Sequence, residues 1–143
     1  MPHTIEVRVA WGDCDEAGII FYPNYFYWMD SAFHDFLRTR GLNHAEFCAA
    51  YRARGLPIVE ANAKFFAAAT YGELLRVEVE VAHWGTKSFR TGCKGFRGDQ
   101  LIFEGYEVRV WAVDGPDGTI RTAPIPAGFR AALAAPGETA RDG

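Results

Sequence analysis

The stretch Trp11-Gly12-Asp13-Cys14-Asp15-Glu16-Ala17-Gly18-Ile19-Ile20-Phe21-Tyr22-Pro23-Asn24-Tyr25-Phe26 joins an acidic loop, bounded by two glycines, to an aromatic segment. Pro23 suits the first turn of a helix, because the backbone N–H that proline lacks would have no partner there. Asp13 and Asp15 lie one residue apart just before this helix start. A carboxylate in that position can attack a carbonyl or activate water, while backbone N–H groups polarise the carbonyl. The stretch therefore favours acyl-transfer chemistry.

A long helix is predicted from Asn24 to about Arg40, because apolar residues recur there at helical spacing. Basic residues near its end suit the negative pole of the helix dipole, and Gly41 is a natural C-cap. The helix is apolar over most of its circumference, which indicates that other elements wrap around it. A second, short helix is predicted from about Asn43 to Arg54.

The rest of the chain has the alternation of apolar and polar residues that is typical of strands. Turn-forming glycines and aspartates separate these segments. The expected strands are Thr4–Ala10, Ile58–Thr70, Leu74–Ala82, Ser88–Phe96 and Leu101–Val113, followed by a short pairing segment at Thr119–Ala123 and a helix or turn at Pro126–Leu133.

This order of elements predicts an α+β fold, in which a curved antiparallel β-sheet wraps around the long central helix. Such a sheet has open edges, and pairing with a second copy covers them, so we expect at least a dimer. The chain has 143 residues, which suits one domain. We expect that domain over residues 1–135, with residues 136–143 as a flexible C-terminal tail.

Composition narrows the function classes. The net charge is −3 and no long basic stripe is present, which argues against nucleic acid as a partner. The three cysteines are far apart, so neither a disulfide framework nor a zinc site is expected. No signal peptide and no membrane-spanning stretch is evident, which favours a cytoplasmic protein. We expect no metal and activity without one.

In these residues the chain resembles the hotdog-fold thioesterases, specifically the 4-hydroxybenzoyl-CoA thioesterase family. The most specific block is Gly12-Asp13-Cys14-Asp15-x-Ala17-Gly18-Ile19, followed by Phe21-Tyr22-Pro23-Asn24-Tyr25. The resemblance runs in order over roughly residues 3–133. Its supporting blocks are Trp28-x-Asp30, Pro57-Ile58-Val59, Asn62-Ala63-x-Phe65, Lys87-Ser88-Phe89, Glu107-Val108-Arg109-Val110 and Ile125-Pro126.

The resemblance implies a hotdog fold and hydrolysis of an aromatic acyl-CoA to the free acid and CoA. Asp15 would be the catalytic carboxylate, as nucleophile or as general base. The backbone N–H of Tyr22 would polarise the thioester carbonyl, and Asp30 would lie near the aryl end of the acyl group. CoA is part of the substrate, and no cofactor is expected.

The resemblance also implies where CoA and the acyl group bind. Lys87 and Ser88 would face the CoA phosphates, and Trp28 and Asn62 complete the expected substrate-binding set. In this family the site lies at a subunit interface, and dimers pair into a homotetramer. The segment Phe21–Tyr25 holds no histidine, unlike other hotdog branches, which favours the aryl-CoA branch.

One departure weakens the expected grip on CoA. Positions 85 and 86 are glycine and threonine, where close relatives place arginines before the lysine. Arg90 or Arg97 could then serve the phosphates instead.

Several of these residues also have a structural interpretation. Asp15 could be a turn aspartate that accepts local N–H groups, and Asp13 is interpreted as a structural cap. Asp30 could face solvent at a subunit seam, because a carboxylate on so apolar a helix must be paired or hydrated. His34 is interpreted as a core or interface histidine, and Cys14 as filler.

Other functions remain open at this point. Within the same fold, the substrate could be a fatty acyl-CoA or an acyl group on acyl carrier protein, or the chain could bind acyl-CoA without catalysis. The Asp-x-Asp pattern after an apolar strand also occurs in haloacid-dehalogenase-like phosphatases. That fold alternates strands and helices, whereas a meander is predicted here.

Overall fold

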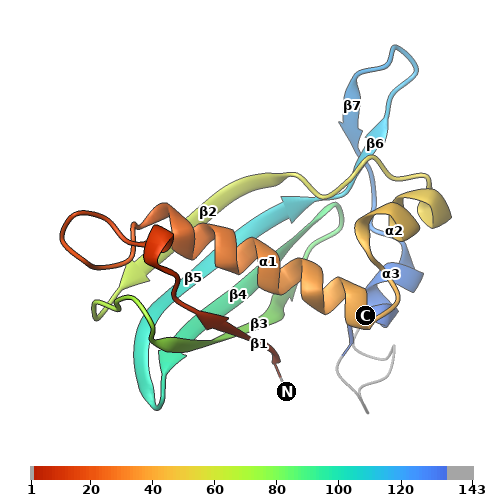
Figure 1. Cartoon of the computed structure of the whole chain (residues 1–143). Helices are drawn as coiled ribbons and strands as arrows, with labels where there is room; N and C mark the ends of the chain where they lie inside the picture. The colour runs from red at the N-terminus through yellow and green to blue at the C-terminus, as the bar shows by residue number, and fades with distance from the viewer. Residues whose placement is uncertain (1, 135–143) are drawn as a thin grey trace.

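Five antiparallel strands form one curved sheet that lies along the helix α1 (Figure 1). The structure is a computed structural model that describes residues 2–134; the tail expected at 136–143 lies outside this range. The elements in chain order are β1 (His3–Arg8), η1 (Trp11–Asp13), α1 (Pro23–Thr39), α2 (His44–Tyr51), β2 (Ile58–Phe65), β3 (Leu74–Trp84), β4 (Ser88–Arg97), β5 (Gln100–Val110), β6 (Ala112–Asp114), β7 (Ile120–Thr122) and α3 (Ala127–Ala132).

The strand order in the sheet is β1-β3-β4-β5-β2. The consecutive strands β3, β4 and β5 form a meander, and β1 and β2 flank it from the N-terminal half of the chain. The predicted α+β arrangement, a curved antiparallel sheet with a long helix against it, is confirmed. In Figure 1 the loop before α1 lies at one end of the molecule, and α2 and α3 lie at the other.

Three predicted boundaries are wrong by three residues or more. The strand expected to reach Thr70 ends at Phe65, because residues 66–73 turn to contact the loop before α1. The strand expected to reach Val113 breaks at Trp111, whose N–H donates to Lys87 O at 2.9 Å. The second helix ends at Tyr51, since Arg52 takes a left-handed conformation with φ 55°.

The core lies between α1 and the concave face of the sheet. One face of α1 is buried there, including Trp28, Met29 and Phe33. Gly105 on β5 allows this close approach, because a Cβ there would lie 2.5 Å from Asn62 O and 2.9 Å from Met29 Cε. Larger residues at position 105 would push the helix away from the sheet.

Strand β2 is an open edge. Its residues are exposed or half-buried, and none is buried. The apolar side chains of Ile58, Val59 and Phe65 are 42%, 61% and 46% exposed. A strand with free backbone groups and exposed apolar side chains is suited to pairing with another strand.

Candidate active site

Asp15 lies in a tight turn before α1. The Gly18 N–H donates to Asp15 O at 2.9 Å, and the Asp15 N–H donates to Ile19 O at 2.9 Å. Gly18 has φ +80°, a conformation that favours glycine. The carboxylate is exposed, and its Oδ1 accepts from the Ala17 N–H at 2.8 Å. Asp15 is thus a turn aspartate through one oxygen, while Oδ2 makes no hydrogen bond within residues 2–134.

Asp13 holds the start of α1 in place. Its carbonyl oxygen accepts from the Phe21 N–H and from Asn24 Nδ2, both at 2.8 Å. Its side-chain Oδ2 accepts from the Ala10 N–H at 2.8 Å. The structural interpretation of Asp13 is confirmed.

Tyr22 is the N-cap residue of α1 and precedes Pro23. In the described part of the chain, the Tyr22 N–H has no hydrogen-bond acceptor. Helix starts leave such N–H groups free, and the helix dipole makes them favourable partners for negative charge. This N–H therefore has the chemistry that an oxyanion requires.

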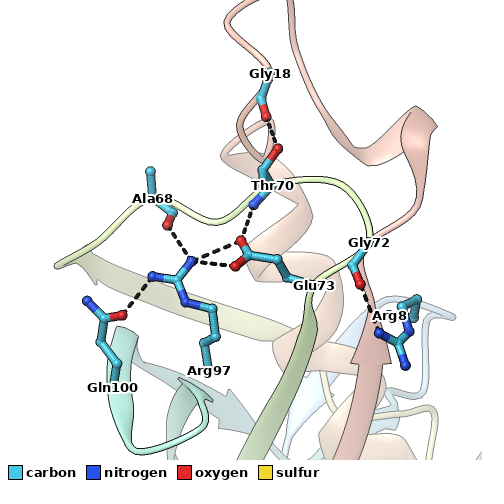
Figure 2. Close-up of polar contacts among 8 residues, drawn as sticks. All are labelled: Arg8, Gly18, Ala68, Thr70, Gly72, Glu73, Arg97 and Gln100. Carbon is cyan, nitrogen blue, oxygen red and sulfur yellow. Dashed lines mark hydrogen bonds and ion pairs between the residues drawn. The ribbon is translucent and has the colours of Figure 1, made fainter.

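A polar clamp connects the loop 66–73 to the turn that carries Asp15 (Figure 2). We define this clamp as Thr70, Glu73 and Arg97. The Thr70 hydroxyl donates to Gly18 O, and Glu73 Oε1 accepts from the Thr70 N–H at 2.7 Å. Arg97 Nη1 contacts both Glu73 carboxylate oxygens at 2.9 Å and Ala68 O at 3.0 Å. The loop 66–73 is thereby fixed to the turn that carries Asp15.

The clamp also assigns Arg97 a structural role. Sequence reasoning considered Arg97 and Arg90 for CoA phosphates, but the Arg97 guanidinium is engaged with Glu73 and Gln100. The Arg90 guanidinium lies over the Tyr106 ring, 4.2 Å from its centroid, on the outer face of the sheet, so it too already has a partner within the chain.

Asp30 joins a cluster between α1 and β5. Arg109 Nη2 donates to Asp30 Oδ1 at 2.6 Å and to Glu107 Oε1 at 2.8 Å. His34 Nε2 lies 3.5 Å from the same Asp30 oxygen. The side chains of Arg109 and Glu107 are 3% and 2% exposed, whereas that of Asp30 is 48% exposed. Asp30 is therefore paired on its inner side and open on its outer side.

The cluster shifts the ionisation of both carboxyls in opposite directions. The hydrogen bond from His34, and then the Arg109 guanidinium, lower the pKa of Asp30 to about 2, against the effect of its partial burial. Burial raises the pKa of Glu107, against the lowering effect of Arg109. Asp30 is accordingly the ionised member that faces solvent.

Sequence reasoning did not find Arg109 and Glu107. A signal was present, because both occupy inward positions of the predicted strand that also carries Phe103 and Trp111. Two charges on the apolar face of a strand require a partner across the core, and Asp30 is that partner.

The predicted CoA-binding residues Lys87 and Ser88 lie at the opposite end of the sheet from Asp15. Strand β3 runs 11 residues from the Asp15 end to the turn before Lys87, which is about 35 Å at the usual rise per residue. The Lys87 side chain is exposed, and its carbonyl oxygen accepts from the Trp111 N–H. One chain alone does not bring Lys87 to Asp15.

Asn62 and Trp28 are also separated from the Asp15 turn. Asn62 is paired with Tyr106 in the sheet register, on the outer face away from α1. It lines an open cavity of about 340 Å³ with charged residues such as Lys64 and Glu80. Trp28 is 5% exposed and packs edge-on against Tyr25. Within residues 2–134, neither side chain makes a hydrogen bond to the Asp15 carboxylate.

A second cavity, of about 320 Å³, adjoins the Asp30 cluster. It is lined by His34, His44 and Leu56, among others. In residues 2–134, no group of three or more His, Cys, Asp or Glu side chains is arranged to hold a metal ion. None of the helices in that range is long and apolar enough to cross a membrane.

Comparison with known proteins places these features in context. The sequence model of the thioesterase-like superfamily matches residues 9–133. The 4-hydroxybenzoyl-CoA thioesterase of Pseudomonas sp. (strain CBS-3) is 35% identical over 133 residues, which cover 88% of this chain and 93% of that enzyme.

Solved structures give the same result. A gentisyl-coenzyme A thioesterase is 35% identical with a TM-score of 0.77, covering 91% of this chain and 98% of that one. An aspartate-to-asparagine mutant of 4-hydroxybenzoyl-CoA thioesterase, in complex with 4-hydroxybenzoyl-CoA, is 32% identical with a TM-score of 0.82. That match covers 92% of this chain and 97% of the other.

Proposed function

The chain belongs to the thioesterase-like superfamily and is a thioester hydrolase of the hotdog fold, and we propose that it hydrolyses aromatic acyl-CoA thioesters. The products are the aromatic acid and free CoA. The observation that carries the proposal is that the segment leading into α1 holds both an exposed carboxylate, Asp15, and, at the helix start, the Tyr22 N–H without a hydrogen-bond acceptor in residues 2–134. The similarity to enzymes named for 4-hydroxybenzoyl-CoA and gentisyl-CoA supports an aromatic acyl group.

In the proposed reaction, Asp15 acts through its free oxygen. As a nucleophile it forms a mixed anhydride with the acyl group and expels the CoA thiolate, and water then cleaves the anhydride. As a general base it removes a proton from water, which attacks the thioester carbonyl and expels the same thiolate. In both routes the Tyr22 N–H stabilises the negative charge on the carbonyl oxygen.

Asp30 receives the far end of the acyl group in this proposal. It lies eight residues after Tyr22, which is about 12 Å along the helix axis at 1.5 Å per residue. That separation suits one aromatic ring, with a hydrogen bond at each end. Its outer side is open, so a substituent on the ring can reach it.

The complete site requires a second copy of the chain. When two β2 strands pair antiparallel, the two-fold axis brings the Lys87 end of one chain beside the Asp15 end of the other. We propose that Lys87 and Ser88 of the partner subunit face the CoA phosphates there. Asn62 and Trp28 then contribute from the strand and helix that border the interface, and dimers pair into a tetramer.

Sedimentation velocity tests the assembly. We expect a dimer or a tetramer for the unmodified chain. Val59→Glu on β2 places a charge on the open edge and should shift the species towards monomer, with loss of turnover. A monomer that turns over aryl-CoA would contradict the shared site.

A thiol-release assay tests the activity. The panel is 4-hydroxybenzoyl-, benzoyl-, phenylacetyl-, hexanoyl- and palmitoyl-CoA, each with the unmodified chain, Asp15→Asn and Glu16→Gln. Glu16 is an exposed carboxylate in the same turn, so its variant is a matched control. We expect turnover of the aryl thioesters that is lost in Asp15→Asn and retained in Glu16→Gln. EDTA should change nothing, because no cofactor or metal is proposed.

The other outcomes identify the alternatives. Preference for palmitoyl-CoA would indicate a fatty acyl thioesterase, and turnover only of acyl carrier protein substrates would indicate that class. Binding without turnover would indicate an acyl-CoA-binding protein. The proposal also places the enzyme in the cytoplasm, which fractionation of cells expressing the tagged chain would test.

A further inference from the structure

Arg109 is an unusual residue to find in the core of this sheet. It is 3% exposed, and its guanidinium lies over the Phe33 ring at 4.5 Å. Nη2 donates to Asp30 and to Glu107, and Nη1 donates to Leu56 O at 3.2 Å. Nε is buried, with no hydrogen-bond partner in the part of the chain that the structure describes.

Stability does not account for this arrangement. Removing charges from water is unfavourable, and replacing a buried ion pair by packed apolar side chains is often neutral or stabilising. The orphan Nε–H adds a further penalty. A chain that needed only a filled core at this position would be served as well by methionine or leucine. The cluster is therefore better explained by a role in binding than by stability. Asp30 is the member of the cluster that reaches solvent and could contact a ligand.

The hydrogen bonds of the cluster are all on one side of Asp30. Arg109 and His34 both approach Oδ1, at 2.6 and 3.5 Å. Within residues 2–134, Oδ2 accepts no hydrogen bond, and 48% of the side chain is exposed. A carboxylate held by one oxygen presents the other in a fixed direction. That free oxygen accepts hydrogen bonds and cannot donate them while the group is ionised.

The position of Arg109 is itself fixed from several sides. Glu107 anchors Nη2 from the same strand, Leu56 O anchors Nη1, and the Phe33 ring covers one face of the guanidinium. Such a planar group, contacted at its edge and on its face, cannot turn away from Asp30 without losing these contacts.

We propose that Arg109 is a positioning residue, which fixes Asp30 so that the acyl pocket selects aromatic rings carrying a hydrogen-bond donor, such as a hydroxyl or amino group, at the end far from the thioester. This inference rests on the proposed function, in which Asp30 already receives the far end of the acyl group, and adds to it the residue that holds Asp30 in position. A ring without a donor leaves the Asp30 carboxylate without the hydrogen bond that it would otherwise receive.

The test compares donor-bearing and donor-free substrates in a single preparation of enzyme. We choose 4-hydroxybenzoyl-CoA and 4-aminobenzoyl-CoA against 4-fluorobenzoyl-CoA and benzoyl-CoA. The ratio of kcat/KM values does not depend on the fraction of folded enzyme, so a general loss of structure cancels. For the unmodified chain we expect a preference for the donors of about 10- to 100-fold, the usual range for a hydrogen bond to a charged group.

Three variants then locate the cause of the preference. Arg109→Met should reduce it to about 3-fold or less, while benzoyl-CoA is still cleaved. Arg109→Lys keeps the charge but cannot contact Asp30, Glu107 and Leu56 O together, and should give an intermediate ratio. In the Asp30→Asn background, Arg109→Lys should change the ratio no further, because Arg109 acts through Asp30.

Arg76→Met is the matched control. Arg76 also pairs with a glutamate two residues along its strand, Glu78, and also lies over a phenyl ring, that of Phe96. It contacts neither Asp30 nor the Asp15 turn, so its substitution should leave the ratio unchanged.

Two outcomes would overturn the inference. One is an unmodified enzyme that cleaves aryl-CoA with no preference for donors, and the other is a preference that survives in Arg109→Lys and Arg109→Met alike. If Arg109→Met does not fold, the ratio of kcat/KM values measured for Arg109→Lys tests the inference by itself. Failure of the proposed function looks different, because the unmodified chain would then cleave none of the four thioesters.

Discussion

The two aspartates that matter most for the proposed site are held in opposite ways. Asp15 lies exposed in a turn, and its carboxylate accepts a hydrogen bond from the backbone N–H of Ala17, two residues away. Asp30 lies on a helix and is held by side chains from β5 and from its own helix. A carboxylate exposed to water is free to react and contributes little to folding stability. A carboxylate paired with a buried arginine is fixed in direction, so it affects both folding stability and the way a substrate is bound.

The largest effect should come from the exposed aspartate. Asp15→Asn keeps an oxygen that can accept from the Ala17 N–H, but removes the carboxylate. We expect kcat to fall by about 1000-fold, in the range for loss of a catalytic base, in a stopped or continuous thiol-release assay. The free energy of unfolding should change by less than about 0.5 kcal/mol, as for other surface substitutions. A large loss of stability would show that the turn, and not the reaction, depends on this group.

Substitution in the buried cluster should instead lower the free energy of unfolding. Arg109→Met leaves Glu107 and Asp30 without their cation, and breaking a buried ion pair destabilises a protein by about 3 kcal/mol or more. Urea unfolding, followed by circular dichroism, measures the difference. Arg76→Met, whose side chain is more exposed, should lose less than about 1 kcal/mol. Equal losses in the two variants would remove the contrast between the regions.

A smaller effect concerns acid stability. The pKa of Asp30 is lowered to about 2 in the folded chain, from 3.8. Its contribution is therefore fully present above the unfolded pKa, and is lost as pH falls through about 2. We expect Asp30→Asn to be less stable than the unmodified chain at pH 6, with a smaller difference in the free energy of unfolding at pH 2.5. The Asp30 carboxylate also raises the pKa of Glu107, so the difference reports Asp30 together with its effect on Glu107. A gap that stays constant would refute this.

The smallest effect should come from the clamp below the Asp15 turn. Thr70→Val removes the hydroxyl that donates to Gly18 O. One hydrogen bond contributes about 1 kcal/mol to the stability of the ordered turn, which is about 5-fold in its population. Because only the ordered turn positions Asp15, kcat/KM for aryl-CoA should fall by about the same factor. Thr70→Ser keeps the hydroxyl and should retain most of the activity. Identical rates in the two variants would show that the turn is rigid without the clamp.

The sequence predicted the parts of the molecule that local patterns control. The Pro23 start of α1, the apolar faces of that helix and the meander β3–β5 all follow from residue spacing. The end of β2 at Phe65 did not follow, because residues 66–73 are drawn away by contacts with a loop some 50 positions earlier, such as the one between Thr70 and Gly18.

For the candidate site, the sequence was enough to propose residues but not to predict how they lie relative to one another. Asp15 and Tyr22 are seven positions apart in one loop and helix start, so a local pattern was enough to propose them together. Lys87 lies at the other end of the sheet, and only a second chain could bring such a residue to Asp15. The inward position of Arg109 on its predicted strand was a signal, but its partner Asp30 on α1 depends on a contact between segments that are distant in sequence. The same holds for the contact of Arg97 with the loop that carries Thr70 and Glu73.

The order of strands in the sheet has a consequence for how this chain is made. Residues 2–73 contain both edge strands, the long helix and the Asp15 turn, yet β1 and β2 do not pair with each other. Strand β1 pairs with β3 and β2 pairs with β5, so neither edge strand can join the sheet before its partner is made. Strand β5 ends at Val110. During synthesis the Asp15 turn therefore leaves the ribosome before Arg97 and the meander strands that complete its surroundings. The smallest fragment that could hold this turn in place is nearly the whole described chain.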